Sequence, residues 1–196
     1  NALPYQREIA PDQPDHVGYN PAFSGLMLNY NRVNFVWTRA NDGWTVGMNA
    51  EGLRFVPSVR GVNVKIATRD QPLFTYQAEE PQEIWSVAAP ALGTGGSRWL
   101  PLRRPAPYAA EVFQTLCAAQ GIPLPDAQSL ADLPQNTNRL AQDQSAPLAA
   151  LLQKMLKYST NITAEAVGLA ASGATNQAQS AQKMTDWSRD IFGITA

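Results

Sequence analysis

In residues 145–172 the sequence SAPLAALLQKMLKYSTNITAEAVGLAAS contains two helical patterns that meet at Ser159-Thr160-Asn161. In each pattern, apolar residues recur three and four positions apart, which predicts a helix with one apolar stripe. The first stripe consists of Leu148, Leu151, Leu152, Met155 and Leu156, and the second of Ile162, Ala166, Leu169 and Ala170. We therefore expect a hydroxyl and a carboxamide, two positions apart, on a short turn between two buried helices.

The ends of both predicted helices carry residues that are favourable there. Ser145 can accept hydrogen bonds from the first amides of the first helix, and Pro147 is tolerated in a first turn. Asn161 is a favourable N-cap for the second helix, and Glu165 lies near the positive end of that helix dipole. On these grounds alone, Ser159-Thr160-Asn161 could be a capping turn as well as a functional site.

The sequence around this tripeptide favours the functional interpretation. A Ser-x-Pro-Leu is followed by an apolar helix that ends in Met-Leu-Lys-Tyr, then by Ser-Thr-Asn and an Ala-Glu in the next helix. With GYNPAFSGLMLNYNRV at residues 18–33 and SRWLPLRRPAPYAA at residues 97–110, nearly the whole chain resembles one family. It is similar to the low-molecular-mass class C penicillin-binding proteins, the D-alanyl-D-alanine carboxypeptidase/endopeptidases of the bacterial cell wall.

The resemblance implies a serine acyltransferase with three motifs. A Ser-x-x-Lys supplies the nucleophile and its base, a Ser-x-Asn supplies a proton relay and an amide, and a Lys-Thr-Gly binds the substrate carboxylate. The division is physically reasonable, because serine needs an adjacent base and the oxyanion needs fixed donors. Only Ser-x-Asn is present at the family position, with Ser159 as the proton relay and Asn161 as the substrate-orienting residue. We therefore expect an internal fragment of a longer enzyme, with the nucleophile outside this chain.

A second Ser-x-x-Lys candidate is present at Ser180-Ala181-Gln182-Lys183. It follows the Ser-x-Asn motif, whereas the nucleophile motif of the family precedes it. Its serine also falls inside a helical pattern, away from the amides and the positive dipole end of a helix N-terminus. Neither Lys-Thr-Gly nor His-Thr-Gly occurs in the sequence. We predict that residues 180–183 are not catalytic and that the isolated chain is not an enzyme.

The composition excludes several other classes of function. A net charge of −1 gives no general attraction to nucleic acid or to anionic membranes. No apolar run is long enough to span a bilayer. His16 is the only histidine and has no second His or Cys nearby, so we expect neither a metal site nor a cofactor. One cysteine in the chain cannot form an internal disulfide.

The first half of the chain has the patterns of a β-rich structure. Residues 1–20 are proline-rich and irregular, and alternating apolar runs from Leu26 to about Val87 predict short antiparallel strands. Leu53 and Phe55 belong to one such run. The sequence Asn41-Asp42-Gly43 predicts a hairpin turn. Gly-Thr-Gly-Gly at residues 93–96 lacks the ending of a phosphate-binding loop and predicts a tight turn.

The predicted fold class is α+β. The resemblance implies a helical part of a transpeptidase domain, like that of penicillin-binding proteins and serine β-lactamases, joined to an antiparallel β-rich inserted region. The expected division is a mainly β region at 1–105, a helix and proline-rich connection at 106–144, and the helical part with Ser-x-Asn at 145–196.

The resemblance further implies that the complete protein cleaves peptidoglycan stem peptides or cross-links through an acyl-serine intermediate. Its partners would be peptidoglycan peptides, β-lactams and the remaining segments of the same polypeptide, in the periplasm. The chain shows no start methionine and no signal peptide. Carboxypeptidase or endopeptidase action could dominate. An alternative is a non-catalytic exported β-rich module that binds peptidoglycan or a protein partner; an unrelated hydrolase has little support.

Overall fold

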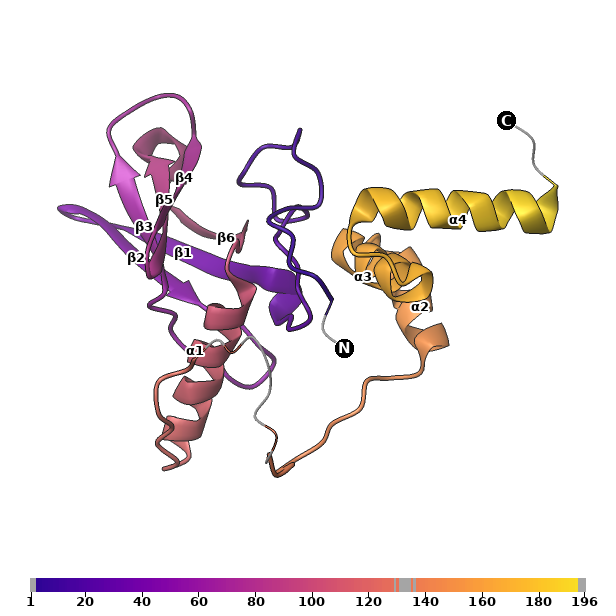
Figure 1. Ribbon diagram of the computed structural model, residues 1–196. Helices are drawn as coiled ribbons and strands as arrows, with labels where there is room; N and C mark the ends of the chain where they lie inside the picture. The colour runs from indigo at the N-terminus through magenta and orange to yellow at the C-terminus, as the bar shows by residue number, and fades with distance from the viewer. Residues whose placement is uncertain (1–2, 129, 131–134, 136, 194–196) are drawn as a thin grey trace.

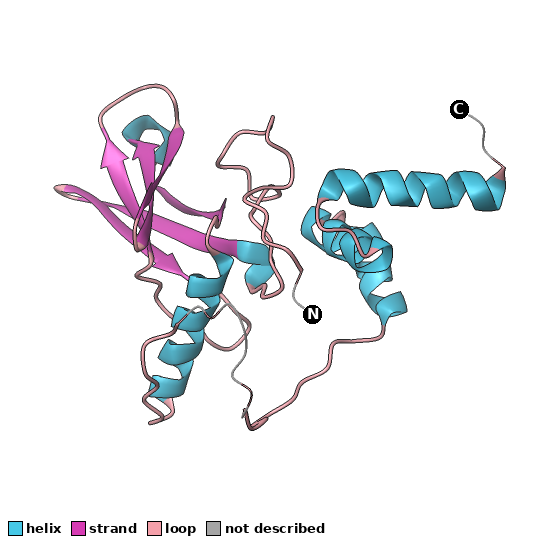
Figure 2. Ribbon diagram, viewed as in Figure 1, coloured by secondary structure: helices cyan, strands magenta, loops and turns pink. Residues whose placement is uncertain are grey.

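The computed structural model describes residues 3–128, 130, 135 and 137–193. In this part of the chain, strands and helices are largely separated along the sequence, so the α+β class is confirmed (Figures 1 and 2). All six described strands end by Pro101, and three of the four described α-helices begin at Leu148 or later. None of the described helices is long and apolar enough to cross a membrane.

The first sheet is antiparallel, with the strand order β2-β1-β6. β1 (Arg32–Ala40) pairs with β2 (Gly43–Asn49) so that Ala40 lies opposite Gly43, and the predicted hairpin is therefore confirmed. β6 (Gly95–Pro101) pairs with the other edge of β1. The predicted tight turn at residues 93–96 is thus only half right, because its last two residues already belong to β6.

The second sheet has the order β3-β5-β4. β4 (Phe74–Glu79) is antiparallel to β5 (Gln82–Ala88), whereas β3 (Val62–Ala67) is parallel to β5. This parallel pair differs from the antiparallel expectation. β5 takes the central place because it is almost entirely buried, while β4 is mostly exposed.

The two sheets and the helix α1 (Pro105–Ala119) share one hydrophobic core. Phe35 and Trp85, two aromatic residues of the strands, are fully buried in it. The strand expected at Leu53 and Phe55 is wrong. These residues lie in the connection after β2, where Gly52 donates its N–H to the carbonyl of Phe55 at 3.0 Å, and both side chains are exposed.

Two buried or half-buried carboxylates join α1 to the second sheet. Glu83 on β5 accepts the backbone N–H groups of Arg103 and Arg104, each at 2.8 Å, immediately before α1 begins. Glu111 on α1 accepts the N–H groups of Arg60 and Gly61 at 2.6 and 2.9 Å, immediately before β3. All four bonds connect a carboxylate side chain to backbone amides, which is among the stronger kinds of protein hydrogen bond.

The irregular N-terminal segment is held in place by Arg103. The Arg103 side chain is buried and donates to the carbonyl oxygens of Asn20, Asp15 and Arg7 at 2.6, 3.0 and 3.2 Å. This segment lies between the β-sheets and the C-terminal helices in Figure 1. Its Phe23 is fully buried in a second small core with side chains of the C-terminal helices.

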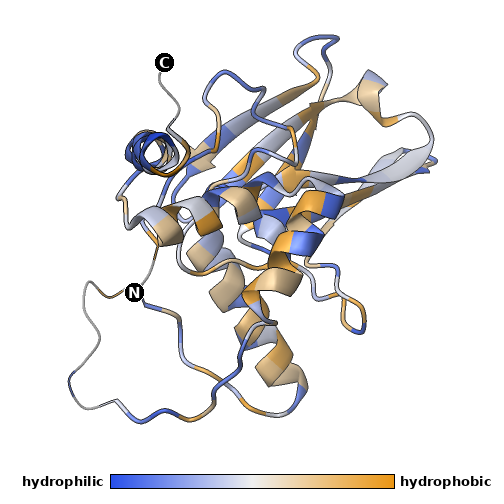
Figure 3. Ribbon diagram, turned by 90° about the vertical axis from the view of Figure 1, so that its right-hand side faces the viewer, coloured by the Kyte–Doolittle hydropathy of each residue, from blue (hydrophilic) through white to orange (hydrophobic). Residues whose placement is uncertain are grey.

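The C-terminal helices are α2 (Leu148–Tyr158), α3 (Asn161–Ser172) and α4 (Gln177–Phe192). Ile162 and Leu169 of α3 pack against Phe23, as the predicted stripe requires, but Ala170 is exposed. α2 has no buried residue, and Leu156 is 76% exposed, so the expectation of two buried helices is wrong for α2. α4, viewed along its axis in Figure 3, carries mostly hydrophilic residues.

Candidate functional site

The tripeptide Ser159-Thr160-Asn161 forms a tight connection between α2 and α3. Ser159 has φ 51° and ψ 49°, the left-handed conformation, and its N–H donates to the carbonyl of Met155. Thr160 donates to the same carbonyl at 3.2 Å, and α3 begins at the next residue. The predicted short turn is therefore present. The left-handed conformation costs a serine roughly 1–2 kcal/mol, which the two hydrogen bonds to the Met155 carbonyl help to offset.

The N-caps differ from the prediction at both helices. Thr160, with φ −83° and ψ 98°, is the N-cap of α3, and Asn161 is already its first helical residue. The cause is the left-handed backbone of Ser159, which reverses the direction of the chain one residue earlier than an N-cap at Asn161 would require. Likewise Pro147 is the N-cap of α2, so Ser145 lies outside the helix. Neither cap residue accepts a hydrogen bond with its side chain.

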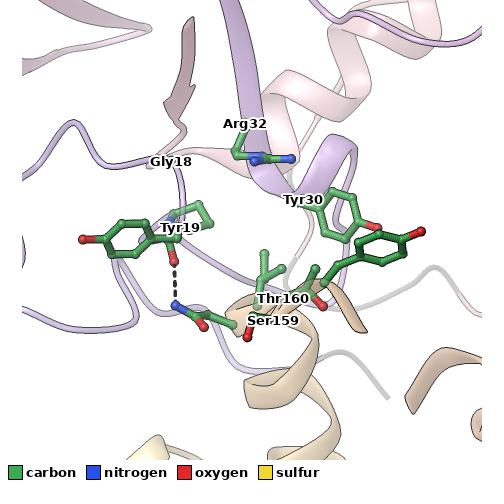
Figure 4. A pocket seen from close by; sticks show the side chains of 10 residues that line it. Gly18, Tyr19, Tyr30, Arg32, Ser159 and Thr160 are labelled. Atoms are coloured by element: carbon green, nitrogen blue, oxygen red, sulfur yellow. Dashed lines mark hydrogen bonds between the residues drawn. The ribbon is translucent and has the colours of Figure 1, made fainter. Parts of the chain in front are cut away.

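A cavity of about 150 Å³ lies at this turn. Its walls come from two distant parts of the sequence, as Figure 4 shows. They are Gly18, Tyr19, Pro21, Tyr30 and Arg32 from the N-terminal third and Tyr158, Ser159, Thr160, Asn161 and Ile162 from the helices. The structure thus brings both sequence-predicted site residues to one cavity. Tyr30 and Arg32 were not predicted as site residues, although they lie in the stretch 18–33 that carries part of the family resemblance.

Ser159 and Asn161 are both exposed at the cavity. The amide Nδ2 of Asn161 donates to the carbonyl oxygen of Tyr19 at 3.4 Å, which links the helices to the N-terminal segment (Figure 4). At this distance the bond is weak. The Ser159 hydroxyl has no hydrogen-bond partner among the described residues, so it is available to a ligand.

The opposite wall of the cavity starts from an unusual backbone turn. Asn29, Tyr30 and Asn31 have φ values of 52°, 56° and 51°, so all three are left-handed. The buried Asn31 side chain stabilises the turn: it accepts the N–H of Leu28 at 3.2 Å and donates to the carbonyl of Ala22 at 2.8 Å. The turn positions Tyr30, and β1 begins directly after it with Arg32.

Arg32 places a positive charge in the wall of the cavity that Ser159 and Asn161 also line. Its guanidinium carbon lies 5.4 Å from the centre of the Tyr30 ring and 5.2 Å from that of Trp99. Burial lowers the pKa of Arg32 from its usual value, but an arginine keeps its charge at neutral pH.

The second candidate motif lies elsewhere. Ser180 is the fourth residue of α4; it is 2% exposed and accepts a hydrogen bond from the Ser172 hydroxyl at 3.0 Å. Lys183 is exposed and donates to the carbonyl of Ser172 at 3.1 Å. Neither residue lines the cavity at Ser159.

The one histidine packs against an aromatic ring. His16 stacks on Phe74 with 4.9 Å between the ring centres, and burial together with the nearby Arg98 lowers the pKa of its imidazole. Among the residues that the structure describes, no group of three or more His, Cys, Asp or Glu side chains is arranged to hold a metal ion.

This architecture resembles that of a solved protein structure. The fold is similar to that of penicillin binding protein 4 from Haemophilus influenzae, with a TM-score of 0.60 and 18% sequence identity. The match covers 86% of this chain and 38% of that protein, so this chain spans well under half of its length. At this identity the similarity shows the fold alone. A comparison with curated proteins gives no match.

The family comparison is the more specific one. The sequence model of the D-Ala-D-Ala carboxypeptidase 3 (S13) family matches residues 5–195, which is nearly the whole chain. It confirms the resemblance to class C penicillin-binding proteins that the motifs indicated. The chain belongs to the D-Ala-D-Ala carboxypeptidase 3 (S13) family.

Proposed function

We propose that this chain is the part of a D-alanyl-D-alanine carboxypeptidase/endopeptidase that carries the Ser-x-Asn motif. The complete protein would cleave peptidoglycan stem peptides or cross-links in the periplasm through an acyl-serine intermediate, and would bind β-lactams. The observation that carries the proposal is the placement of Ser159, on the connection between α2 and α3, and of Asn161, the first residue of α3, both exposed at one cavity. Family membership supplies the reaction class.

In this proposal Ser159 relays protons. A hydroxyl is both a donor and an acceptor, so it can receive a proton from a base and pass it to the leaving amine. Its geometry suits the task, because the Ser159 backbone is fixed by the end of α2 and its side chain is exposed at the cavity. A group at hydrogen-bond distance from the reacting atoms is the first requirement of general acid–base catalysis.

Asn161 would orient the substrate. A carboxamide can donate to and accept from a peptide group, and substrate binding can replace the weak bond to the Tyr19 carbonyl at 3.4 Å. The first turn of α3 fixes the position of the Asn161 backbone. Because such positioning lowers the entropic cost of reaching the transition state, its loss should affect turnover more than folding.

The nucleophile and the carboxylate-binding strand would come from other segments of the polypeptide. The match to a solved protein of which this chain spans 38% is consistent with such segments. Ser180 is not a substitute, because it is buried, bonded to Ser172 and absent from the cavity.

The test uses the full-length polypeptide that contains these residues, with D-Ala release from a peptide ending in D-Ala-D-Ala as the readout. Asn161→Ala and Asn161→Asp should each lower kcat/KM by roughly 10- to 100-fold, which corresponds to the loss of one substrate hydrogen bond of about 1.5–3 kcal/mol. Their melting temperatures should stay unchanged, because Asn161 is not an N-cap.

Asn176→Ala is the matched control. The Asn176 side chain does cap its helix, α4, by accepting the N–H of Gln179 at 2.9 Å. Its removal should cost about 1 kcal/mol of stability and leave turnover unchanged. If Asn161→Ala and Asn161→Asp release D-Ala at the wild-type rate, the proposed role of Asn161 is wrong.

A further inference from the structure

The loop of residues 16–19 belongs to the irregular N-terminal segment and forms part of the wall of the cavity at Ser159. Gly18 and Tyr19 line the cavity. The Tyr19 carbonyl also accepts the weak hydrogen bond from Asn161 at 3.4 Å (Figure 4). A change in the position of this loop would therefore change the cavity and the link between the N-terminal segment and α3.

Both ends of the loop are fixed by one buried side chain. Arg103 donates to the carbonyl of Asp15 at 3.0 Å and to the carbonyl of Asn20 at 2.6 Å. Between these two points, His16 connects the loop to the second sheet by stacking on Phe74 of β4, with 4.9 Å between the ring centres and 20° between the ring planes. Loss of this stack would free the loop between its fixed ends.

A positive charge on His16 is unfavourable in this place. The Phe74 ring already has a cation over it, because the guanidinium carbon of Arg98, on β6, lies 4.7 Å from its centre. The other charged group that acts on His16 is Asp15, whose carboxylate already pairs with two guanidinium groups at 3.5 and 3.6 Å, so it is only partly available as a counter-ion. Burial and Arg98 accordingly lower the pKa of the His16 imidazole, and Asp15 opposes them only in part.

We propose that His16 is a pH-dependent latch: its neutral ring holds the loop of residues 16–19 against the second sheet, and its protonation releases the loop and loosens the cavity wall at Gly18 and Tyr19. Acid would then act on the cavity from outside it, because His16 is not one of the lining residues. The latch is a property of the fold, and only its effect on catalysis rests on the proposed function.

The direction of the pH effect follows from the lowered pKa of His16. The closed loop binds the proton less readily than the open loop, in which the pKa of an exposed histidine is about 6.5. The closed state is therefore fully stable above this value. Its stability falls as the pH decreases from about 6.5 through the pKa of His16 in the closed state.

The first measurement is the titration of His16 itself. His16 is the only histidine of the chain, so its ring resonance in a proton NMR titration of the 196-residue chain gives its pKa directly. This pKa should lie below 6.5 in the wild type and should rise in Arg98→Gln, which removes the cation from the shared Phe74 ring. Arg39→Gln is the matched control and should leave it unchanged, because Arg39 lies over a different ring, 4.8 Å from the centre of Trp44, and does not act on His16.

Release of the loop is measured by amide hydrogen exchange at Asn20, whose N–H donates to the Val17 carbonyl at 3.0 Å. Its protection factor, corrected for the intrinsic pH dependence of exchange, should fall between about pH 7.5 and about pH 5. The fall should approach tenfold for each pH unit by which the measured pKa of His16 lies below that of an exposed histidine. His16→Phe keeps a ring for the stack and cannot be protonated, so its protection factor should stay constant.

The inference is wrong if His16 titrates at or above pH 6.5, or if protection at Asn20 falls equally in the wild type and in His16→Phe. If His16→Phe fails to fold, Arg98→Gln decides, because a raised pKa of His16 should reduce the fall in protection. D-Ala release by the full-length polypeptide reports the effect on the cavity: relative to His16→Phe, the wild type should lose activity at about pH 5 but not at about pH 7.5. Equal rates at both pH values would contradict the control of the cavity by the latch, whereas no release by either polypeptide, with the exchange difference intact, would contradict only the proposed function.

Discussion

Replacing Glu83 by Gln tests whether this buried carboxylate joins the second sheet to α1. Glu83 is 2% exposed and accepts two backbone N–H groups, those of Arg103 and Arg104, at 2.8 Å each. A glutamine of the same shape keeps one acceptor oxygen but turns an NH₂ group toward the second N–H. The variant loses one hydrogen bond to a charged group and leaves a buried donor unsatisfied, which should cost about 2–3 kcal/mol.

The assay is thermal unfolding of the chain, followed by circular dichroism. At roughly 2–4 °C per kcal/mol for a chain of this size, Glu83→Gln should lower the melting temperature by about 4–12 °C. Glu80→Gln is the control, because Glu80 pairs with Arg104 at 3.0 Å but is 85% exposed, and the variant should melt within about 2 °C of the wild type. A Glu83→Gln melting temperature equal to that of Glu80→Gln would refute the reasoning.

The pH dependence provides a second readout of Glu83. Burial raises the pKa of its carboxyl, and the N–H groups of Arg103 and Arg104 oppose this rise only in part. The folded state therefore binds a proton at pH values where the unfolded state has lost it. Protonation of Glu83 therefore stabilises the folded state. This contribution is complete below about pH 4.5, and it is lost as the pH rises through the folded-state pKa of Glu83. Wild-type stability should fall over this interval relative to that of Glu83→Gln, which has no titrating group there.

Two further predictions concern serines. Ser159→Gly should raise the melting temperature, because glycine adopts φ 51° without the cost of roughly 1–2 kcal/mol that serine pays. D-Ala release by the full-length polypeptide should fall in this variant, and a lower melting temperature would contradict the left-handed conformation of Ser159. A fluorescent penicillin should leave the 196-residue chain unlabelled, since Ser180 is buried and bonded to Ser172; a label that disappears in Ser180→Ala would show that Ser180 is reactive.

The helical half could be predicted from the sequence because apolar spacing is a local property. The stripe around Leu169 and the two-residue connection at Ser159 both follow from it. The exact helix starts could not, because they depend on the left-handed backbone of Ser159, a conformation that serine adopts only where surrounding structure compensates for its cost. The N-cap of α3 is therefore Thr160 and not Asn161, which the sequence predicts.

The β-rich half shows where local patterns are insufficient. β6 opens with Gly95 and Gly96, residues of low strand propensity. A Cβ atom on Gly96 would lie 2.9 Å from the Trp37 ring, so the glycine leaves room for an indole on the neighbouring strand. The parallel pairing of β3 with β5 likewise depends on which strand is most buried after assembly.

The candidate site was predictable in part. Ser159 and Asn161 were identified from a motif, but whether they serve the proposed reaction stays a prediction. Tyr30 and Arg32 come from the other end of the chain, and only the folded arrangement brings them to the same cavity. An arginine at the start of a strand carries no sequence signal of its own that would place it in this cavity.

The left-handed turn at Asn29–Asn31 has a consequence for dynamics. The left-handed conformation costs Tyr30 roughly 1–2 kcal/mol, whereas the asparagines on either side tolerate this conformation better. The turn is held by the Asn31 side chain and by the bond from the Leu102 N–H to the Asn31 carbonyl at 2.9 Å. Such a segment should open locally before the adjacent β1 does. Opening would carry Tyr30 out of the cavity wall, so a ligand that binds the closed cavity must shift the turn toward its closed state. Amide hydrogen exchange at Asn31 would then slow in proportion to ligand occupancy, at a residue that does not line the cavity.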